Sequence, residues 1–137
     1  RVLAPNALKY VDCERFMPLR HGDIVFCPSI YDGDTITVCW VDHSGNKVRS
    51  GCRISGIDTP EMRSSSPHEK ALAIRAKKRL SDAVLNKFVT ITNPAVEKYG
   101  RVLADLKTKE HDSITEHMLC APEICVPYRG GRKQKWD

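Results

Sequence analysis

Two short segments of the chain carry carboxylates whose spacing could do chemistry. They read Asp-Gly-Asp-Thr at positions 32–35 and Asp-Thr-Pro-Glu at 58–61. Each segment lies where a predicted β-strand ends or the next one begins, so a folded sheet could bring them together. Asp34, Asp58 and Glu61 would then crowd negative charge into one place, which only a hard cation makes tolerable. Oxygen ligands of this kind suit Ca²⁺ or Mg²⁺, whereas zinc prefers nitrogen or sulfur.

Two arginines accompany these carboxylates. Arg53 lies within a strand of mostly apolar or small residues, where a guanidinium is costly unless it is paired or faces a ligand. Arg101 follows the third segment, Glu-Lys-Tyr-Gly at 97–100. Planar guanidinium groups can hold a phosphate through paired hydrogen bonds. Carboxylates, a hard cation and two arginines together indicate a site that cleaves phosphodiester bonds.

Each segment also has a purely structural interpretation. Aspartate and glycine are the residues that a tight hairpin turn requires. Asp58, Pro60 and Glu61 would also suit the start of a helix. A better helix start lies further on, at Ser66, which leaves residues 58–61 at a strand end where the Thr59 carbonyl can face outward. The functional interpretation therefore depends on the combination of segments.

Size and charge limit the classes of protein to consider. With 137 residues, 41% of them apolar, the chain can form one domain with a core. A net charge of +5 suits a polyanionic partner such as nucleic acid. No apolar run approaches the roughly 20 residues that span a bilayer, and no signal-peptide pattern is present in the given chain. Because the chain begins at Arg1 rather than Met, an upstream targeting segment could have been removed.

The six cysteines form no Cys-x-x-Cys pair, which argues against a structural zinc site. If the turns are centred near Gly33 and Gly45, then Cys27, Cys39 and Cys52 fall side by side on three successive strands. A row of small buried thiols is favoured over a disulfide or a metal site. Reduced cysteines favour an intracellular location.

Hydrophobic patterning places the secondary structure. Strands are expected at residues 23–31, 35–41, 47–57, 87–92 and 101–107. The first two are separated by Asp-Gly, a strong hairpin signal, and Asn-Pro at 93–94 is expected to end the fourth.

Two helices are expected as well. Ser66 as N-cap, Pro67 at the first helical position and Glu69 completing a capping box predict a long helix to about Asn86. A short helix capped by Ser113 should follow the last strand. With residues 1–22 as an irregular lead-in and residues 23–137 as one domain, the order predicts an α+β fold. Its centre would be a five-stranded OB-type β-barrel, with one long helix and one or two short helices.

The motifs, taken in order, resemble those of the staphylococcal (thermonuclease-like) nuclease family over residues 24–119. The resemblance implies an OB-barrel enzyme that hydrolyses phosphodiester bonds of DNA and RNA with Ca²⁺, with Mg²⁺ as the alternative. It implies metal ligands at Asp34, Asp58 and the Thr59 carbonyl. Glu61 would orient or deprotonate the attacking water.

The remaining roles that the resemblance implies concern the substrate. Arg53 and Arg101 would hold the phosphate that is attacked. Lys98 and Tyr99 match positions near a terminal phosphate, and Tyr128 matches a base-stacking tyrosine. The expected partner is DNA and/or RNA, single-stranded or locally unpaired.

The residues alone also allow a different class of function. A non-catalytic OB-type module that binds single-stranded nucleic acid would share the barrel and the positive charge. Such a module would have no reason to keep three carboxylates beside a polyanion, because without metal they repel it. The catalytic interpretation is therefore preferred.

Overall fold

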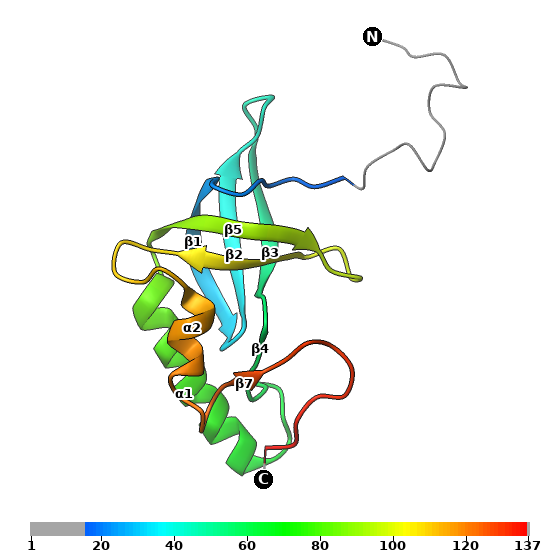
Figure 1. The fold of residues 1–137 in the computed structure, drawn as a ribbon, viewed down its shortest axis with the longest axis vertical. Helices are drawn as coiled ribbons and strands as arrows, with labels where there is room; N and C mark the ends of the chain where they lie inside the picture. Colours follow the sequence, from blue (N-terminus) through cyan, green and yellow to red (C-terminus); the bar gives the residue numbers. More distant parts are fainter. Residues whose placement is uncertain (1–15, 137) are drawn as a thin grey trace, which may run out of the picture.

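A computed structural model describes residues 16–136 of the chain. Cys13 and most of the expected lead-in lie outside the described residues, and the division of the chain at residue 23 stays a prediction. Within the described part, five strands close into a barrel in the order β1-β2-β3-β6-β5 (Figure 1). These strands are β1 (Ile24–Asp32), β2 (Thr35–Val41), β3 (Lys47–Ile54), β5 (Phe88–Val96) and β6 (Val102–Lys107).

The pairing of the strands closes the barrel. β1 pairs with β2 on one side and with β5 on the other, β2 pairs with β3, and β5 pairs with β6, all antiparallel. β3 and β6 are parallel and complete the ring. The predicted α+β fold with a five-stranded OB-type barrel is therefore confirmed.

Two strand ends differ from the sequence prediction. β3 ends at Ile54 because Gly56 has a φ of +80°, and a short strand β4 (Ile57–Asp58) follows the break. β4 pairs with β7 (Val126–Pro127) near the C-terminus. β5 does not stop at Asn93 but continues to Val96, with an irregularity in its pairing with β6 between Thr92 and Ala95. Such a bulge accommodates a proline that cannot donate to the ladder.

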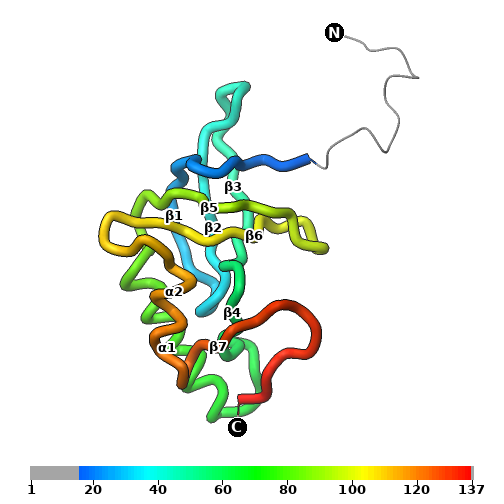
Figure 2. Tube along the Cα trace, in the orientation of Figure 1, coloured from blue at the N-terminus to red at the C-terminus, as the bar shows by residue number. Residues whose placement is uncertain are grey.

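Two helices lie together at one end of the barrel (Figure 2). α1 (Pro67–Val84) is capped by Ser66, whose hydroxyl accepts a hydrogen bond from the Glu69 amide, and α2 (Ile114–Leu119) is capped in the same way by Ser113. The buried face of α1 consists of small and aliphatic residues, namely Ala73, Ala76, Leu80, Ala83 and Val84. No helix in the described part of the chain has the length and apolar character needed to cross a membrane.

The expected row of three cysteines is wrong for Cys39. The turn between β2 and β3 is centred on Ser44, so Cys39 pairs with Arg49, and Cys52 lies opposite Ile36. Cys27 and Cys52 are fully buried free thiols. Burial raises the pKa of Cys27 to about 11 and that of Cys52 to about 12, so both are protonated at neutral pH.

Gly33 joins the first hairpin to the rest of the molecule. Its φ is not positive; the glycine is required because the hairpin turn packs closely against α1 and the end of β4. A Cβ at this position would lie 2.7 Å from the Cβ of Ala76 and 2.9 Å from Oγ1 of Thr59. The turn that carries Asp34 is therefore seated directly on Thr59.

We expect Gly33→Ala to destabilise the protein by about 1–3 kcal/mol, because the added methyl group overpacks a tight contact. The free energy of unfolding from urea denaturation measures this loss. Ser65→Ala, a change at an exposed loop position, should alter stability by less than about 0.5 kcal/mol. Equal stability of the two variants would contradict the close packing of the turn.

Candidate active site

The first hairpin brings Asp34 to the end of the barrel where the helices lie. Asp32 and Thr35 pair across the turn, which leaves Asp34 at its tip. The Thr35 hydroxyl donates a 2.8 Å hydrogen bond to Oδ1 of Asp34, and the Asp34 carbonyl accepts from the amide of Ile54. Asp34 is buried, so its carboxylate has a fixed direction toward β3.

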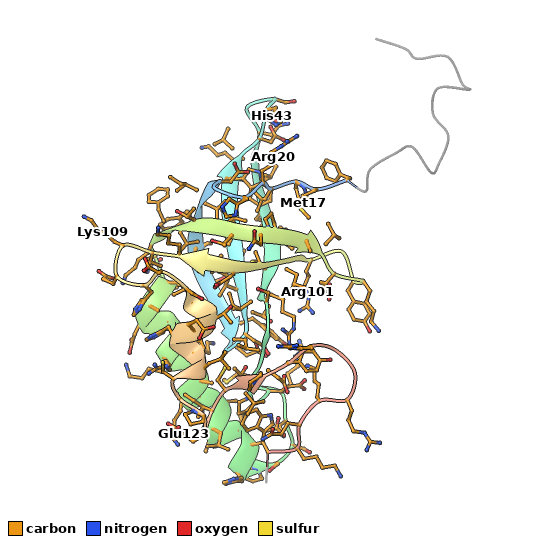
Figure 3. The ribbon with its side chains drawn as sticks, in the orientation of Figure 1. Met17, Arg20, His43, Arg101, Lys109 and Glu123 are labelled. Carbon is orange, nitrogen blue, oxygen red and sulfur yellow. The ribbon has the colours of Figure 1, made fainter. Side chains whose placement is uncertain are left out.

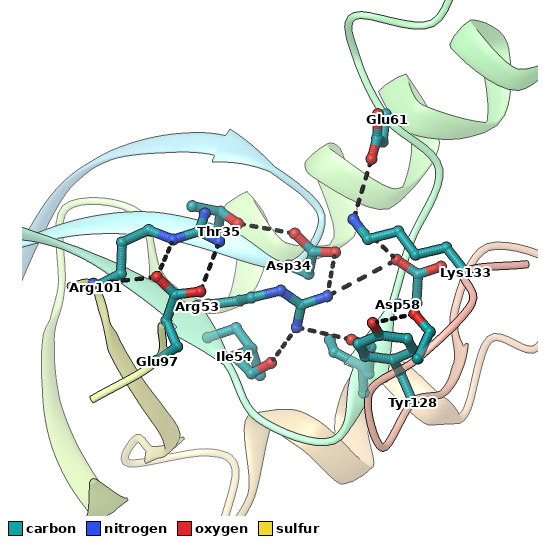
Figure 4. A network of polar contacts seen from close by, with 12 residues as sticks. Asp34, Thr35, Arg53, Ile54, Asp58, Glu61, Glu97, Arg101, Tyr128 and Lys133 are labelled. Atoms are coloured by element: carbon teal, nitrogen blue, oxygen red, sulfur yellow. Dashed lines mark hydrogen bonds and ion pairs between the residues drawn. The ribbon is translucent and has the colours of Figure 1, made fainter. Parts of the chain in front are cut away.

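Arg53 lies at the centre of the charged residues (Figure 4). Its Nη2 is 3.4 Å from Oδ2 of Asp34 and 3.8 Å from Oδ1 of Asp58. Its Nη1 donates to the carbonyls of Ile54 at 3.2 Å and Ile57 at 3.0 Å. The arginine is only 8% exposed, and these contacts satisfy the requirement for a buried guanidinium. The carbonyls also join it to the break between β3 and β4.

Asp58 is the most deeply buried carboxylate of the group, with 1% of its surface exposed. Neither of its carboxylate oxygens has a hydrogen-bond donor among the described residues, and Oγ1 of the neighbouring Thr59 has no partner either. Burial raises the pKa of Asp58, and the nearby Asp34 raises it further, while Lys133 and Arg53 oppose the shift. A buried carboxylate without hydrogen-bond donors requires a nearby cation to stay ionised.

Asp32, which the sequence did not single out, belongs to the same acidic group. Its Oδ1 is buried without a partner. Burial, with Asp34 close by, raises the pKa of Asp32 to about 7. The Asp-Gly-Asp motif could have suggested this residue, but only the fold decides that both aspartates point inward.

Glu61 lies on the loop between β4 and α1, and that loop is held by Glu69. Instead of completing the predicted capping box, the Glu69 carboxylate accepts hydrogen bonds from the Glu61 amide at 2.9 Å and from the Ser64 hydroxyl at 3.0 Å. The Ser66 amide donates to Ser64. Glu69 thus positions the backbone that carries Glu61.

Arg101, directly before β6, reaches the same cavity, but it is already paired. Its Nε and Nη2 donate to the two carboxylate oxygens of Glu97 at 3.2 Å and 3.3 Å. Partial burial by itself raises the pKa of Glu97, but these hydrogen bonds from Arg101 lower it below its usual value. Glu97 therefore holds the guanidinium in place, and Nη1 of Arg101 makes no hydrogen bond in the part of the chain that the structure describes.

The cavity between these groups has a volume of about 210 Å³. Its lining consists of the predicted residues Asp34, Arg53, Glu61 and Arg101 and five others, Tyr31, Asp32, Thr35, Arg63 and Lys133. The larger cavities, of about 850 Å³ and 1330 Å³, are lined by residues such as Trp40 and Val48 and lie away from the charged groups.

Two predicted substrate residues are not brought into this cavity. Lys98 and Tyr99 lie at the turn between β5 and β6, where Tyr99 is 74% exposed and the Lys98 ammonium lies 4.9 Å from the centre of its ring. Tyr128 does lie beside the site, with its ring centre 5.4 Å from Cζ of Arg53.

Lys133 is the residue that sequence reasoning missed most clearly. Its ammonium lies 3.1 Å from Oε1 of Glu61 and 3.9 Å from Oδ1 of Asp58. The segment around it, Gly-Gly-Arg-Lys-Gln-Lys at 130–135, has no periodicity that predicts a return to the barrel. The two glycines, both with positive φ, were the only local signal of a turn.

The donor set suits a hard cation and not a soft one. Among residues 16–136 no group of three or more His, Cys, Asp or Glu side chains is gathered as a ready metal cluster. Asp34 and Asp58 nevertheless place two carboxylates around Arg53, and the Asp58 oxygens, which accept no hydrogen bond from the described residues, fit a Ca²⁺ or Mg²⁺ ion. Such an ion would need further oxygens from the backbone and from water.

We expect Glu69→Ala to loosen the loop that carries Glu61, because it removes two hydrogen bonds to a charged acceptor. Amide hydrogen exchange at Glu61 should become about 10–100-fold faster, the equivalent of about 1.5–3 kcal/mol. Asp82→Ala breaks only an exposed ion pair with Lys78 and should leave this exchange unchanged. An unchanged rate in Glu69→Ala would show that the loop is held by other contacts.

Comparison with known proteins shows which family the chain belongs to. The family model described as staphylococcal nuclease homologue matches residues 51–121, just over half of the sequence. The match includes Arg53, Asp58, Glu61 and Arg101 and leaves out Asp34 and the C-terminal segment. No curated protein matches the chain. With the barrel and the charged cavity at its end, the match shows that this chain belongs to the staphylococcal nuclease homologue family.

Proposed function

We propose that the protein is a metal-dependent nuclease that hydrolyses phosphodiester bonds of DNA and/or RNA. One observation carries the proposal: two buried aspartates flank a buried arginine, and the carboxylate of Asp58 has no hydrogen-bond donor within residues 16–136. This arrangement costs stability. A module that only binds nucleic acid would gain nothing from burying these charges. An enzyme that binds a cation and a phosphate would use both aspartates and the arginine.

Asp34, Asp58 and the carbonyl of Thr59 would hold the cation, which we propose to be Ca²⁺, with Mg²⁺ as the alternative. When bound, the cation would neutralise charge on a non-bridging phosphate oxygen and favour ionisation of a nearby water. The chain supplies only oxygen ligands here, as both ions prefer.

Glu61 is proposed as the base. Water attacks phosphorus in line with the leaving oxygen, a new P–O bond forms as the old one breaks, and the Glu61 carboxylate receives the proton of the water. The Glu61 side chain is 52% exposed and lines the cavity, so water can reach it. Glu69 holds the backbone of Glu61 and limits how far that carboxylate can drift.

Arg53 and Arg101 are proposed to bind the phosphoryl group as charge grows on its oxygens. Arg53 is fixed by two carbonyls and Arg101 by Glu97, so neither has to be ordered when the substrate arrives. By analogy with other phosphoryl transfers, an arginine in this role contributes on the order of 10³–10⁵ in rate, or about 4–7 kcal/mol.

One tyrosine beside Arg53 and one on an exposed turn outside the cavity support a single-stranded or locally unpaired substrate. Tyr128 lies beside Arg53, and Tyr99 and Lys98 lie on the exposed β5–β6 turn that leads to Arg101. Aromatic rings bind nucleic acid by stacking on bases that are not paired. We propose that Lys98 and Tyr99 contact the strand beyond the scissile phosphate and that Tyr128 contacts a base.

A labelled single-stranded oligonucleotide should be cleaved in Ca²⁺ or Mg²⁺ and remain intact in EDTA. Arg53→Lys should lower kcat on the order of 10³-fold, since a point charge cannot reproduce a planar, bidentate grip. Its retained charge beside Asp34 and Asp58 should preserve the fold, which circular dichroism checks. Arg75→Lys, at an exposed ion pair with Glu123, serves as the matched control. Binding without cleavage under any divalent ion would favour a non-catalytic binding module.

Metal binding and catalysis should separate in two further variants. Asp34→Asn should weaken Ca²⁺ binding at least about tenfold in calorimetry, because it removes a buried anionic ligand. Glu61→Gln should leave Ca²⁺ affinity within a few fold and lower kcat by about 10²–10⁴. Equal loss of both properties in Glu61→Gln would mean that Glu61 is a metal ligand and not the base.

A further inference from the structure

The C-terminal segment, residues 128–136, leaves β7 in a wide loop and ends near the N-terminal end of α1 (Figures 1 and 2), and Lys133 within it lines the charged cavity. Its first end is tied to the break between β3 and β4, since the Tyr128 amide donates to the Gly56 carbonyl, and within the segment the Tyr128 hydroxyl donates to the Gly131 carbonyl. At its other end Trp136 is only 8% exposed. We call residues 128–136 the C-terminal strap.

The strap brings Lys133 to the carboxylates. Its ammonium is 3.1 Å from Oε1 of Glu61 and 3.9 Å from Oδ1 of Asp58, and these contacts are drawn in Figure 4. Partial burial by itself lowers the pKa of Lys133, but the interactions with Glu61 and Asp58 raise it above the usual value. The ammonium is therefore charged at neutral pH and compensates the carboxylates.

Lys133 also faces the place where a phosphate would bind. It lines the 210 Å³ cavity together with Arg53 and Arg101, and it lines a second cavity of about 330 Å³ with Asp58, Thr59 and other residues. It thus lies on the boundary between the acidic and the basic parts of the site.

The two positively charged side chains that contact Asp58 differ in how freely they can move. Arg53 is buried and bonded to two carbonyls, so it cannot leave its place without losing both bonds. The Lys133 side chain is 47% exposed and has no hydrogen bond other than the one to Glu61 among the described residues. A lysine is a point charge on a flexible stem, which can change partners at small cost.

We propose that Lys133 is a third cationic residue of the site with two successive partners. Without a divalent cation it neutralises Asp58 and Glu61. When a divalent cation binds Asp58, the like charge repels the ammonium, which then binds a substrate phosphate between Arg53 and Arg101. The inference rests on the proposed nuclease function.

The proposal predicts effects of opposite sign from one substitution. Removing the ammonium should tighten the binding of a divalent cation, because the competing charge is gone, and should weaken the binding of nucleic acid. Because the Lys133 side chain is half-exposed, water screens its charge 3.9 Å from Asp58 almost as strongly as bulk solvent does, and each effect is expected to be about tenfold. A residue that only anchored the strap would weaken both kinds of binding, since the whole site would loosen.

The test compares Lys133→Met with Lys109→Met in the full chain. Lys109 is exposed on the loop after β6, away from Arg101 and the strap (Figure 3), and its loss changes the net charge equally. Calorimetry gives the Kd for Ca²⁺ without nucleic acid. Fluorescence anisotropy at saturating Ca²⁺ gives the Kd for a short single-stranded phosphorothioate oligonucleotide, which resists hydrolysis.

We expect Lys133→Met to lower the Kd for Ca²⁺ about tenfold and to raise the Kd for the oligonucleotide about tenfold, with both values unchanged in Lys109→Met. Lys133→Arg should stay within about threefold of the original protein in both. A weakening of both affinities in Lys133→Met, or no difference from the control, would overturn the proposal, as would a failure of the original protein to bind Ca²⁺.

The outcome separates this inference from the proposed nuclease function. If the two affinities change in opposite directions while no oligonucleotide is cleaved under any divalent ion, the role of Lys133 stands and the nuclease function fails. If cleavage occurs but Lys133→Met behaves like the control, the nuclease function stands and the role of Lys133 fails.

Discussion

The structure of the site depends on the position of the Arg53 guanidinium between Asp34 and Asp58. Each of the three charged groups would be costly to bury alone, and only their proximity makes the arrangement tolerable. The same guanidinium donates to the carbonyls of Ile54 and Ile57, where the chain leaves the barrel. One side chain therefore links the acidic turn, the end of β3 and the start of β4. Loss of any partner would leave an uncompensated charge in the interior.

The elements around this ion-pair cluster hold its members from several directions. The close contact of Gly33 with Ala76 seats the first hairpin on α1. Glu69, at the start of the same helix, ties down the loop of Glu61. Functional groups at the ends of rigid strands, supported by a helix, are better positioned than groups on a free loop. The helix thus serves the site although none of its residues is proposed to touch the substrate.

The charged side chains of the site form ion pairs that differ in burial and in strength. Arg53 and Asp34 form a buried pair, Arg101 is held by Glu97, and Lys133 reaches Glu61 from the C-terminal strap with a half-exposed side chain. A site that binds a cation and an anion must give up some internal pairs when both arrive. The weakest and most exposed pairs can be exchanged at the least cost, since screening by water already reduces their strength. This ordering makes Lys133 the member best suited to change partners.

The sequence by itself determined the barrel, the two helices and four of the residues that line the cavity. Alternating apolar residues, the turn residues and the caps at Ser66 and Ser113 are local signals. They predicted the strands and helices to within a few residues, except that β5 continues four residues beyond its predicted end at residue 92. The motifs also singled out Asp34, Arg53, Asp58 and Arg101, which the fold does bring together. Only the tertiary structure decided the break at Gly56, the register of Cys39, the pairing of Arg101 with Glu97 and the arrival of Lys133. Register, and the contacts of a strap without periodicity, depend on packing between distant residues, which no local pattern encodes.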